Sequence, residues 1–230
     1  EGLEDYLKFL ESIGVDAIIV ADMGIFSLAK RVAPGLELHV STQASTTNWH
    51  TVQMWKELGA TRVVAAREVS LADLKEMKDH VDIEIESFVH GSMCISYSGR
   101  CLLSNYMTGN RDANRGQCSQ SCRWKYSLVE SNRPGEYYPI EEDEHGTYIF
   151  NSKDLCLIHR IPDLYEAGID SLKIEGRMKS VHYCATVAKV YRTAIDTYLK
   201  EGKDWYVRPE WIAELEKISH RPYTDGFAEG

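Results

Sequence analysis

The sequence predicts an α/β fold of the TIM-type (β/α) barrel class, in which parallel strands alternate with covering helices. Short apolar runs of strand length alternate about six times with segments whose apolar residues recur at helical spacing. The turns between them are short, which is typical of strand–helix–strand units. Polar residues collect at the carboxyl ends of the predicted strands, where such a barrel places its active site. We prefer the barrel to an open doubly wound sheet because no predicted strand leads into a glycine-rich phosphate loop.

The first half of the chain is expected to contain four strands and three helices. Apolar and β-branched runs predict the strands at residues 16–22, 36–43, 61–67 and 81–89. Helical spacing predicts helices at residues 3–13 and about 48–58, and Ser70 with Asp73 in the first turn predicts the start of a third. Gly14 and Gly59 each precede a strand and are expected to end the helix before it.

The second half is expected to resume this alternation after a long interruption. The predicted elements are a strand at 147–151, a helix at about 155–167 ended by Gly168, a strand at 171–175 and a helix at about 181–199 stopped by Gly202. Residues 1–202 would then form a barrel that lacks its first two β/α units. We expect residues 203–230 to form a helix and an extended linker toward a C-terminal region outside this sequence. The chain begins with Glu1 rather than Met, which agrees with a part of a longer protein.

Charge and hydropathy exclude some classes of function. The chain of 230 residues carries 26 Lys and Arg against 35 Asp and Glu, so its net charge is -9. This negative net charge argues against binding to nucleic acid through overall charge alone. It is compatible with an enzyme that has a local basic cleft. No apolar run approaches the roughly 20 residues of a membrane span, and the N-terminus does not resemble a signal peptide. We expect a cytoplasmic protein that does not enter a membrane.

Four of the six cysteines cluster in an insertion at about residues 91–146. Cys94, Cys101, Cys118 and Cys122 follow the pattern Cys-x6-Cys-x16-Cys-x3-Cys. Clustered cysteines in an intracellular protein bind metal more often than they form disulfides. The spacing fits zinc and an iron–sulfur cluster about equally, and buried apolar cysteines are the third alternative. Cys156 could replace one ligand, whereas Cys184 is expected in the core.

Several longer motifs then resemble the collagenase-like peptidase family, U-32. They lie at residues 41–45, 86–94, 97–104, 151–155 and 173–180. The resemblance implies a barrel preceded by about two more β/α units and, in many members, a β-rich C-terminal extension. Relatives of this kind are implicated in oxygen-independent hydroxylation of RNA bases or of a quinone precursor, with a 4Fe–4S cluster and with prephenate as the oxygen source.

The branch that forms 5-hydroxyuridine at the wobble position of tRNA is the most similar, on the elements at residues 99–101, 114–118 and 122–126. The resemblance makes Cys94, Cys101, Cys118 and Cys122 the ligands of the cluster and favours iron–sulfur over zinc. It also implies tRNA and prephenate as the binding partners.

Candidate site residues follow from the strand ends and from the insertion. Glu86 and His90 flank the first cysteine and are candidates for acid–base catalysis or for support of the cluster. Cationic and amide side chains could bind the carboxylates of prephenate or read a base, and structural ion pairs are the alternative for them. The substrate-binding candidates are Gln43, Arg67, Asn151, Lys153, Lys173, Glu175 and Arg177.

A basic and aromatic stretch within the insertion is the candidate RNA-binding surface. Its basic residues are Arg111, Arg115, Arg123 and Lys125, and they alternate with Tyr106, Trp124 and Tyr126. Stacking combined with phosphate contacts is how proteins bind single-stranded RNA. The alternative is that these residues only pack the cysteine loop.

Two other functions remain open at this stage. The family name suggests proteolysis, but the sequence contains neither a Gly-x-Ser-x-Gly elbow nor a His-Glu-x-x-His helix. A cysteine peptidase would need a clustered cysteine paired with His90 or His39, which would break the set of four thiolates. A non-catalytic interaction protein is the second alternative.

Overall fold

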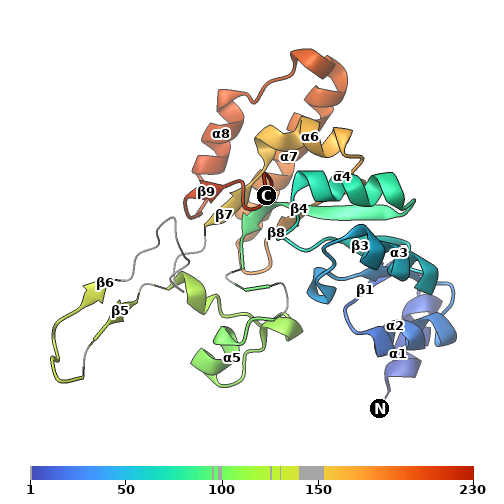
Figure 1. Cartoon of the computed structure of the whole chain (residues 1–230), viewed down its shortest axis with the longest axis horizontal. Coiled ribbons are helices and arrows are strands. Elements are labelled where there is room, and N and C mark those ends of the chain that lie inside the picture. The colour runs from blue at the N-terminus through green and yellow to red at the C-terminus, as the bar shows by residue number, and fades with distance from the viewer. Residues whose placement is uncertain (1, 95, 98–99, 125, 130, 140–152) are drawn as a thin grey trace.

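Five parallel strands form the sheet that positions the site, in the order β1, β2, β3, β4 and β8 (Figure 1). They span Ala17–Val20, Glu37–Val40, Arg62–Val64, Glu84–Ser92 and Ser171–Glu175. The computed structural model describes residues 2–94, 96–97, 100–124, 126–129, 131–139 and 153–230. These five strands lie in the sheet in the same order as in the chain. A doubly wound sheet, by contrast, reverses its strand order at one point.

The sheet is open in the part of the chain that the structure describes. β1 pairs only with β2, and β8 pairs only with β4, so the two outer parallel strands do not meet. The coarser prediction of an α/β fold with a predominantly parallel sheet is confirmed, whereas the closed barrel is not. Closure requires further strands between the two edges, because a barrel of this type has eight.

The helices begin largely where the sequence places polar caps. Asn48 and Ser180 cap α3 and α7, and Ser70 and Asp73 form a capping box at the start of α4. Asp22, predicted as the end of a strand, instead caps a helix that we did not predict, α2. The helices are α1 Leu3–Ser12, α2 Met23–Val32, α3 Trp49–Leu58, α4 Leu71–His80, α5 Leu103–Thr108, α6 Ile161–Glu166, α7 Val181–Glu201 and α8 Pro209–Glu216.

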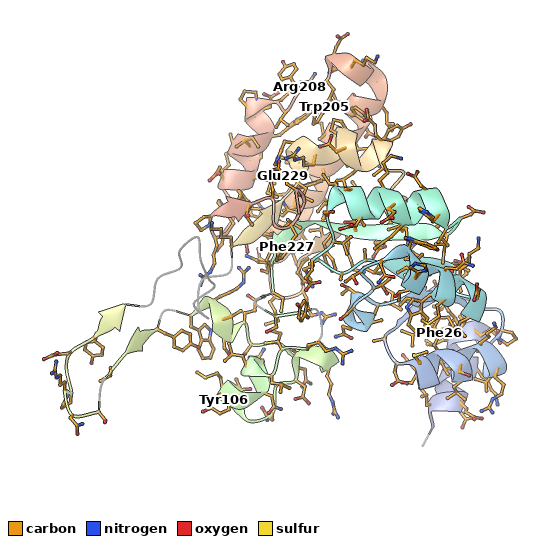
Figure 2. All side chains as sticks on the ribbon, viewed as in Figure 1. Phe26, Tyr106, Trp205, Arg208, Phe227 and Glu229 are labelled. Carbon is orange, nitrogen blue, oxygen red and sulfur yellow. The ribbon has the colours of Figure 1, made fainter. Side chains whose placement is uncertain are left out.

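Apolar side chains of the helices and strands form one core. Val40, Val63 and Ile85 lie at its centre and are fully buried. Phe26 of α2, which is labelled in Figure 2, belongs to this core. Its ring packs against that of Trp55 of α3, with 5.4 Å between the centroids. No helix in the described ranges is both long enough and apolar enough to cross a membrane.

The second half of the chain differs from the prediction in two places. The expected strand at 147–151 lies outside the described residues. A strand is observed shortly after it, β7, Asp154–Cys156, and it runs antiparallel to β4. The expected helix at 155–167 therefore begins later, as α6. Apolar alternation cannot distinguish a short buried strand from the first turn of a helix, which explains the error.

The final segment is part of the fold rather than a linker. β9, Tyr223–Thr224, pairs in parallel with β7, and Trp211, Leu215 and Ile218 are buried in the core. The amide of Leu71, at the start of α4, donates to the carbonyl of Ala228 at 3.0 Å. The expected helix and extended segment are present, as α8 and β9, and both pack on the rest of the fold. The expected connection to a further C-terminal region stays a prediction.

The cysteine insertion leaves the end of β4 and folds against itself. Short 3-10 turns at Ala113–Arg115 and Ser121–Arg123 flank its centre, and β5, Ser127–Leu128, pairs with β6, Tyr138–Pro139, in a projecting hairpin (Figure 1). The amide of Ser119 donates to Ser104 Oγ at 2.9 Å, which ties α5 to the second pair of cysteines.

Candidate active site

A cleft of about 620 Å³ lies between the carboxyl ends of the parallel strands and the cysteine insertion. All four candidate ligands, Cys94, Cys101, Cys118 and Cys122, line this cleft, which we call the cysteine cleft. The strand side contributes Gln43, Arg67, Phe88, Lys173, Glu175 and Arg177. The topology thus brings together residues that are more than 130 positions apart in the chain, from Gln43 to Arg177.

The cysteines are free thiols with different surroundings. Burial raises the pKa of the Cys94 thiol, and the neighbouring Cys101 and Cys122 raise it further. The amide of Gln120, held at a φ of 56°, donates to Cys118 Sγ at 3.3 Å. An amide directed at a sulfur stabilises the thiolate form, which is the form that binds metal.

The four thiols share the cleft without already forming a metal centre. Among the described residues, no group of three or more His, Cys, Asp or Glu side chains is close enough to hold a metal ion. The donor set nevertheless fits a thiolate-ligated group, since four cysteine thiolates are the ligands that iron–sulfur clusters and many structural zinc sites use. The amide that donates to Cys118 Sγ would support such a ligand.

The remaining two cysteines lie elsewhere. Cys156 is buried in β7, where its Sγ is 4.0 Å from the hydroxyl of Tyr191 and burial raises its pKa. Cys184 lies on α7, with its Sγ 3.7 Å from the carbonyl of Gly176. Neither lines the cysteine cleft, which agrees with their exclusion from the predicted ligand set.

Arg67 is held at the strand side of the cleft by two contacts. Its guanidinium carbon lies 3.8 Å from the centroid of the Phe88 ring, and its Nη2 lies 3.3 Å from Glu175 Oε2. Burial lowers the pKa of Arg67, while Glu175 opposes that shift. The group stays charged because an arginine pKa lies far above neutral pH.

Glu86 lies outside the cleft lining and forms an ion pair with Lys173. Its carboxylate accepts hydrogen bonds from Lys173 Nζ at 2.6 Å and from Ser171 Oγ at 2.8 Å, and Arg62 Nη1 lies at 3.4 Å. Burial acts to raise the pKa of Glu86, but these partners outweigh it and the pKa falls below its usual value. Glu86 does not line the cleft, and its observed contact positions Lys173. Its role in acid–base catalysis stays a prediction.

His90 is turned away from the cleft by a β-bulge. The register between β4 and β8 shifts between Phe88 and His90, so His90 pairs with Ile174 and joins the face opposite to that of Phe88. It is fully buried beside Tyr191, and burial lowers its pKa to about 4. In this structure His90 is therefore neutral near pH 7 and faces away from the cleft, and its role in acid–base catalysis or in support of the cluster stays a prediction.

Two of the predicted RNA-binding arginines have structural contacts. Arg123 Nη2 lies 2.5 Å from Asp154 Oδ1, and both side chains are buried. Arg111 donates to the carbonyls of Gln117 and Cys118 at 3.1 and 3.4 Å. These contacts agree with the alternative of packing the cysteine loop, although Arg123 also lines the cleft. That Arg111 and Arg123 bind RNA stays a prediction.

Arg115 and Arg177 line the cleft from opposite sides and are exposed. Arg115 pairs with Asp112 at 3.4 Å. Arg177 contacts the insertion, because a Cβ on Gly116 would clash with its Nη1. These two residues retain the positions expected of groups that bind an anion.

Of the four remaining predicted site residues, the structure describes Lys153 and Gln43. Asn151 and Lys125 lie outside the described residues. Lys153 is exposed, and its carbonyl accepts from Arg123 at 3.2 Å, but it does not line the cleft. Its contact with substrate stays a prediction. Gln43 lines the cleft from the 3-10 turn Thr42–Ala44.

Sequence reasoning missed Phe88 and Asp154. Phe88 lies two residues after Glu86 on the same strand face, so the period of two could have placed it at the strand end. Asp154 lies in the motif at residues 151–155, but its partners Arg123 and Lys179 come from distant segments, so these ion pairs could not be predicted from local spacing.

Comparisons with known proteins identify relatives. The model of Peptidase family U32 matches residues 1–230. The chain is 53% identical over 230 residues to "tRNA hydroxylation protein P1" of Bacillus subtilis (strain 168), covering 100% of this chain and 54% of that protein. It is 41% identical to "tRNA hydroxylation protein P" of Escherichia coli (strain K12), covering 96% of this chain and 57% of that protein.

A more distant relative carries a different name. The chain is 36% identical over 224 residues to the "23S rRNA 5-hydroxycytidine C2501 synthase" of Escherichia coli (strain K12), covering 95% of this chain and 33% of that protein. The chain therefore spans about half the length, or less, of these curated relatives.

Proposed function

The chain belongs to peptidase family U32, and we propose that it carries out the oxygen-independent hydroxylation of uridine in tRNA at the wobble position. The names of the relatives support RNA hydroxylation as the reaction. The observation that carries the proposal is the cysteine cleft, in which four thiols face a group of cationic side chains at the strand ends. A redox group beside a basic cavity suits an anionic RNA substrate on an otherwise acidic protein.

We propose a 4Fe–4S cluster on Cys94, Cys101, Cys118 and Cys122. When bound, such a cluster supplies electron transfer and activation of a bound substrate. The chain's own contribution is to support the ligands: the Gln120 amide donates to Cys118, and the guanidinium of Arg67 favours the thiolate form of Cys94. Zinc is the alternative occupant, and an iron measurement distinguishes the two.

We propose prephenate as the oxygen source, bound by cations of the cleft. Prephenate carries two carboxylates, and arginine binds carboxylates through two parallel hydrogen bonds. Arg177 is exposed in the cleft, and Lys173 is fixed there by Glu86 at 2.6 Å. These two residues are therefore our candidates for the carboxylate contacts.

The proposed tRNA substrate implies a cellular location, and the strand order supports the predicted barrel. A protein that modifies tRNA must meet tRNA in the cytoplasm, so we propose a cytoplasmic location. The strands β1, β2, β3, β4 and β8 lie in chain order, which supports an arc of a TIM-type barrel completed by further strands.

The decisive experiment is mass spectrometry of tRNA nucleosides from a strain that lacks the gene. We expect 5-hydroxyuridine-type nucleosides to be lost in the deletion strain and restored by the wild-type protein but not by Cys118→Ser. Cys184→Ser is the matched control, because Cys184 lies outside the cleft, and it should restore the nucleosides fully.

The outcome that would overturn the proposal is an unchanged nucleoside profile in the deletion strain. Gelatin cleavage that survives Cys118→Ser would instead favour the peptidase function. Among the described residues that line the cleft there is no histidine, the usual partner of a cysteine nucleophile.

A further inference from the structure

A buried carboxylate of the sheet contacts the cysteine insertion. Asp154 of β7 is fully buried, and its Oδ1 lies 2.5 Å from Arg123 Nη2. The side chain of Arg123 is itself only 9% exposed, and its Nη2 also donates to the carbonyl of Lys153 at 3.2 Å. One guanidinium group thus ties the end of the 3-10 turn Ser121–Arg123 to two consecutive residues at the start of β7.

The residue before Arg123 is Cys122, one of the four cysteines of the cleft. Cys122 and Arg123 both line the cleft, and Cys122 is 8% exposed. The same turn sets the backbone of both residues, because the amide of Arg123 donates to the carbonyl of Gln120 at 2.8 Å. A 3-10 turn of three residues has little stability of its own. An anchor on the Arg123 side chain therefore restricts the position of the Cys122 thiol, since the two residues share a rigid peptide plane.

The carboxylate of Asp154 has further partners outside the insertion. Lys179 Nζ lies at 3.5 Å, and the amide of Arg221 donates at 3.1 Å. Burial acts to raise the pKa of Asp154, but Arg123 and these partners outweigh it, so the group stays ionised. Among the described residues that contact this carboxylate, Arg123 is the one that belongs to the insertion, so it carries the link between β7 and the cysteines.

We propose that Asp154 is a positioning residue that holds Cys122 in the cysteine cleft through Arg123. The buried pair orders the turn in the folded chain, so that Cys122 offers its sulfur from a fixed position. The benefit to metal binding rests on the proposed cluster, whereas the placement of Cys122 itself does not.

The test is the rate at which iodoacetamide alkylates each cysteine, read by peptide mass spectrometry. Full-length protein is purified without oxygen and treated with an iron chelator, so that metal protects no thiol. The variants are Asp154→Asn and Arg123→Gln, alone and combined. Cys156 is the reference within the same molecule, because it is 6% exposed in β7 and its alkylation reports opening of the strand that carries Asp154.

We expect slow alkylation of both Cys122 and Cys156 in the wild-type protein, because both are buried. Either single variant should accelerate alkylation of Cys122 by about tenfold, since the turn then opens more easily, while Cys156 stays slow. The combined variant should show no further rise, because both changes remove the same contact.

Lys179→Gln is the matched control. It removes a cation from the same buried carboxylate but leaves the contact between Asp154 and Arg123 in place. Alkylation of Cys122 should therefore stay within about twofold of the wild-type rate. An equal acceleration in Lys179→Gln would overturn the inference, because it would make the charge around Asp154 responsible rather than the contact with Arg123.

Two other results would overturn the inference. An unchanged rate at Cys122 in Arg123→Gln would mean that the turn holds its place without the anchor, and this variant decides the matter if Asp154→Asn does not fold. Equal acceleration of Cys122 and Cys156 would mean that the pair only stabilises the fold. Wild-type protein that contains no iron before chelation would contradict the proposed cluster and would leave the alkylation result valid.

Discussion

Charged residues around the cleft are held in opposite-charge pairs that fix their positions. Arg67 pairs with Glu175, Lys173 with Glu86, and Arg123 with Asp154, and the second member of each pair comes from a different strand or loop. Such pairs contribute little net stability when buried, but removing one partner leaves an uncompensated charge. Their main consequence here is that cations face the cleft in a set orientation.

The buried His90 predicts a dependence of stability on pH. Its pKa is lowered by burial from 6.5 to about 4, so the unfolded chain binds the proton more readily than the folded chain. The stabilising contribution is complete above pH 6.5 and is lost as the pH falls toward 4. Between pH 7 and pH 5 we expect the free energy of unfolding to fall by about 2 kcal/mol because of His90.

Urea unfolding of His90→Gln at both pH values measures this contribution. The variant should lack about 2 kcal/mol of the pH-dependent loss. His182→Gln is the control, because His182 is exposed on α7, and it should lose as much stability as wild type. An identical pH dependence in His90→Gln and wild type would contradict the assignment.

The buried carboxylate of Asp154 predicts a large mutational effect. Arg123 lies at 2.5 Å and Lys179 at 3.5 Å, and the amide of Arg221 donates at 3.1 Å. Asp154→Asn leaves two cations without their counter-charge, so we expect a loss of about 3 kcal/mol in urea unfolding. Asp196→Asn, at an exposed pair with Arg192, should change stability by less than about 0.5 kcal/mol. Similar losses in the two variants would contradict the role of Asp154.

At the scale of elements, helix starts follow from local chemistry, whereas strand ends do not. The capping box of Ser70 and Asp73 and the C-cap at Gly59, with a φ of 100°, lie where the sequence predicts them. The strand face of His90 could not be predicted, because the bulge depends on how β4 pairs with β8. The missed β7 likewise forms only because β4 and β9 provide its partners.

Gly91 is an element-scale position with a specific prediction. Its φ is 112°, and a Cβ there would clash with the backbone carbonyl of Glu175 in the adjacent strand. Gly91→Ala should therefore separate β4 from β8 and displace Glu175, which holds Arg67. We expect a loss of more than about 2 kcal/mol in thermal or urea unfolding.

Gly14→Ala separates backbone strain from the clash. Gly14 has a φ of 75° with nothing within 4 Å of the added Cβ, so this control carries strain alone, at about 1 kcal/mol. Equal losses in the two variants would show that the contact between Gly91 and Glu175 is unimportant.

At the scale of the whole molecule, the sheet and the insertion together define the cleft. The sheet supplies Arg67, Lys173 and Glu175, and the insertion supplies the four thiols. The buried ion pair of Arg123 and Asp154 joins the two parts, because Arg123 belongs to the insertion and Asp154 to β7. A change at this pair should therefore affect the geometry of the cysteines as well as stability.

The iron content of the purified protein tests whether the four cysteines hold the proposed cluster. Protein purified without oxygen should be brown, absorb broadly in the visible region and contain about four iron atoms per chain. Cys118→Ser should lower the iron content, whereas Cys184→Ser should leave it unchanged because Cys184 lies outside the cleft. Colourless protein with one zinc per chain would contradict the proposed cluster.

The sequence by itself determined the alternation of strands and helices, the helix starts at Asn48 and Ser70, the helix ends at Gly59 and Gly202, and the identity of the four clustered cysteines. These features depend on residues close together in the chain, where periodicity and spacing carry the information. Only the tertiary structure decided that Glu86 positions Lys173, that His90 is sealed in the core and that Phe88 supports Arg67. Each of these depends on strand pairing between distant segments, and a shift of one residue in register reverses which face a side chain occupies.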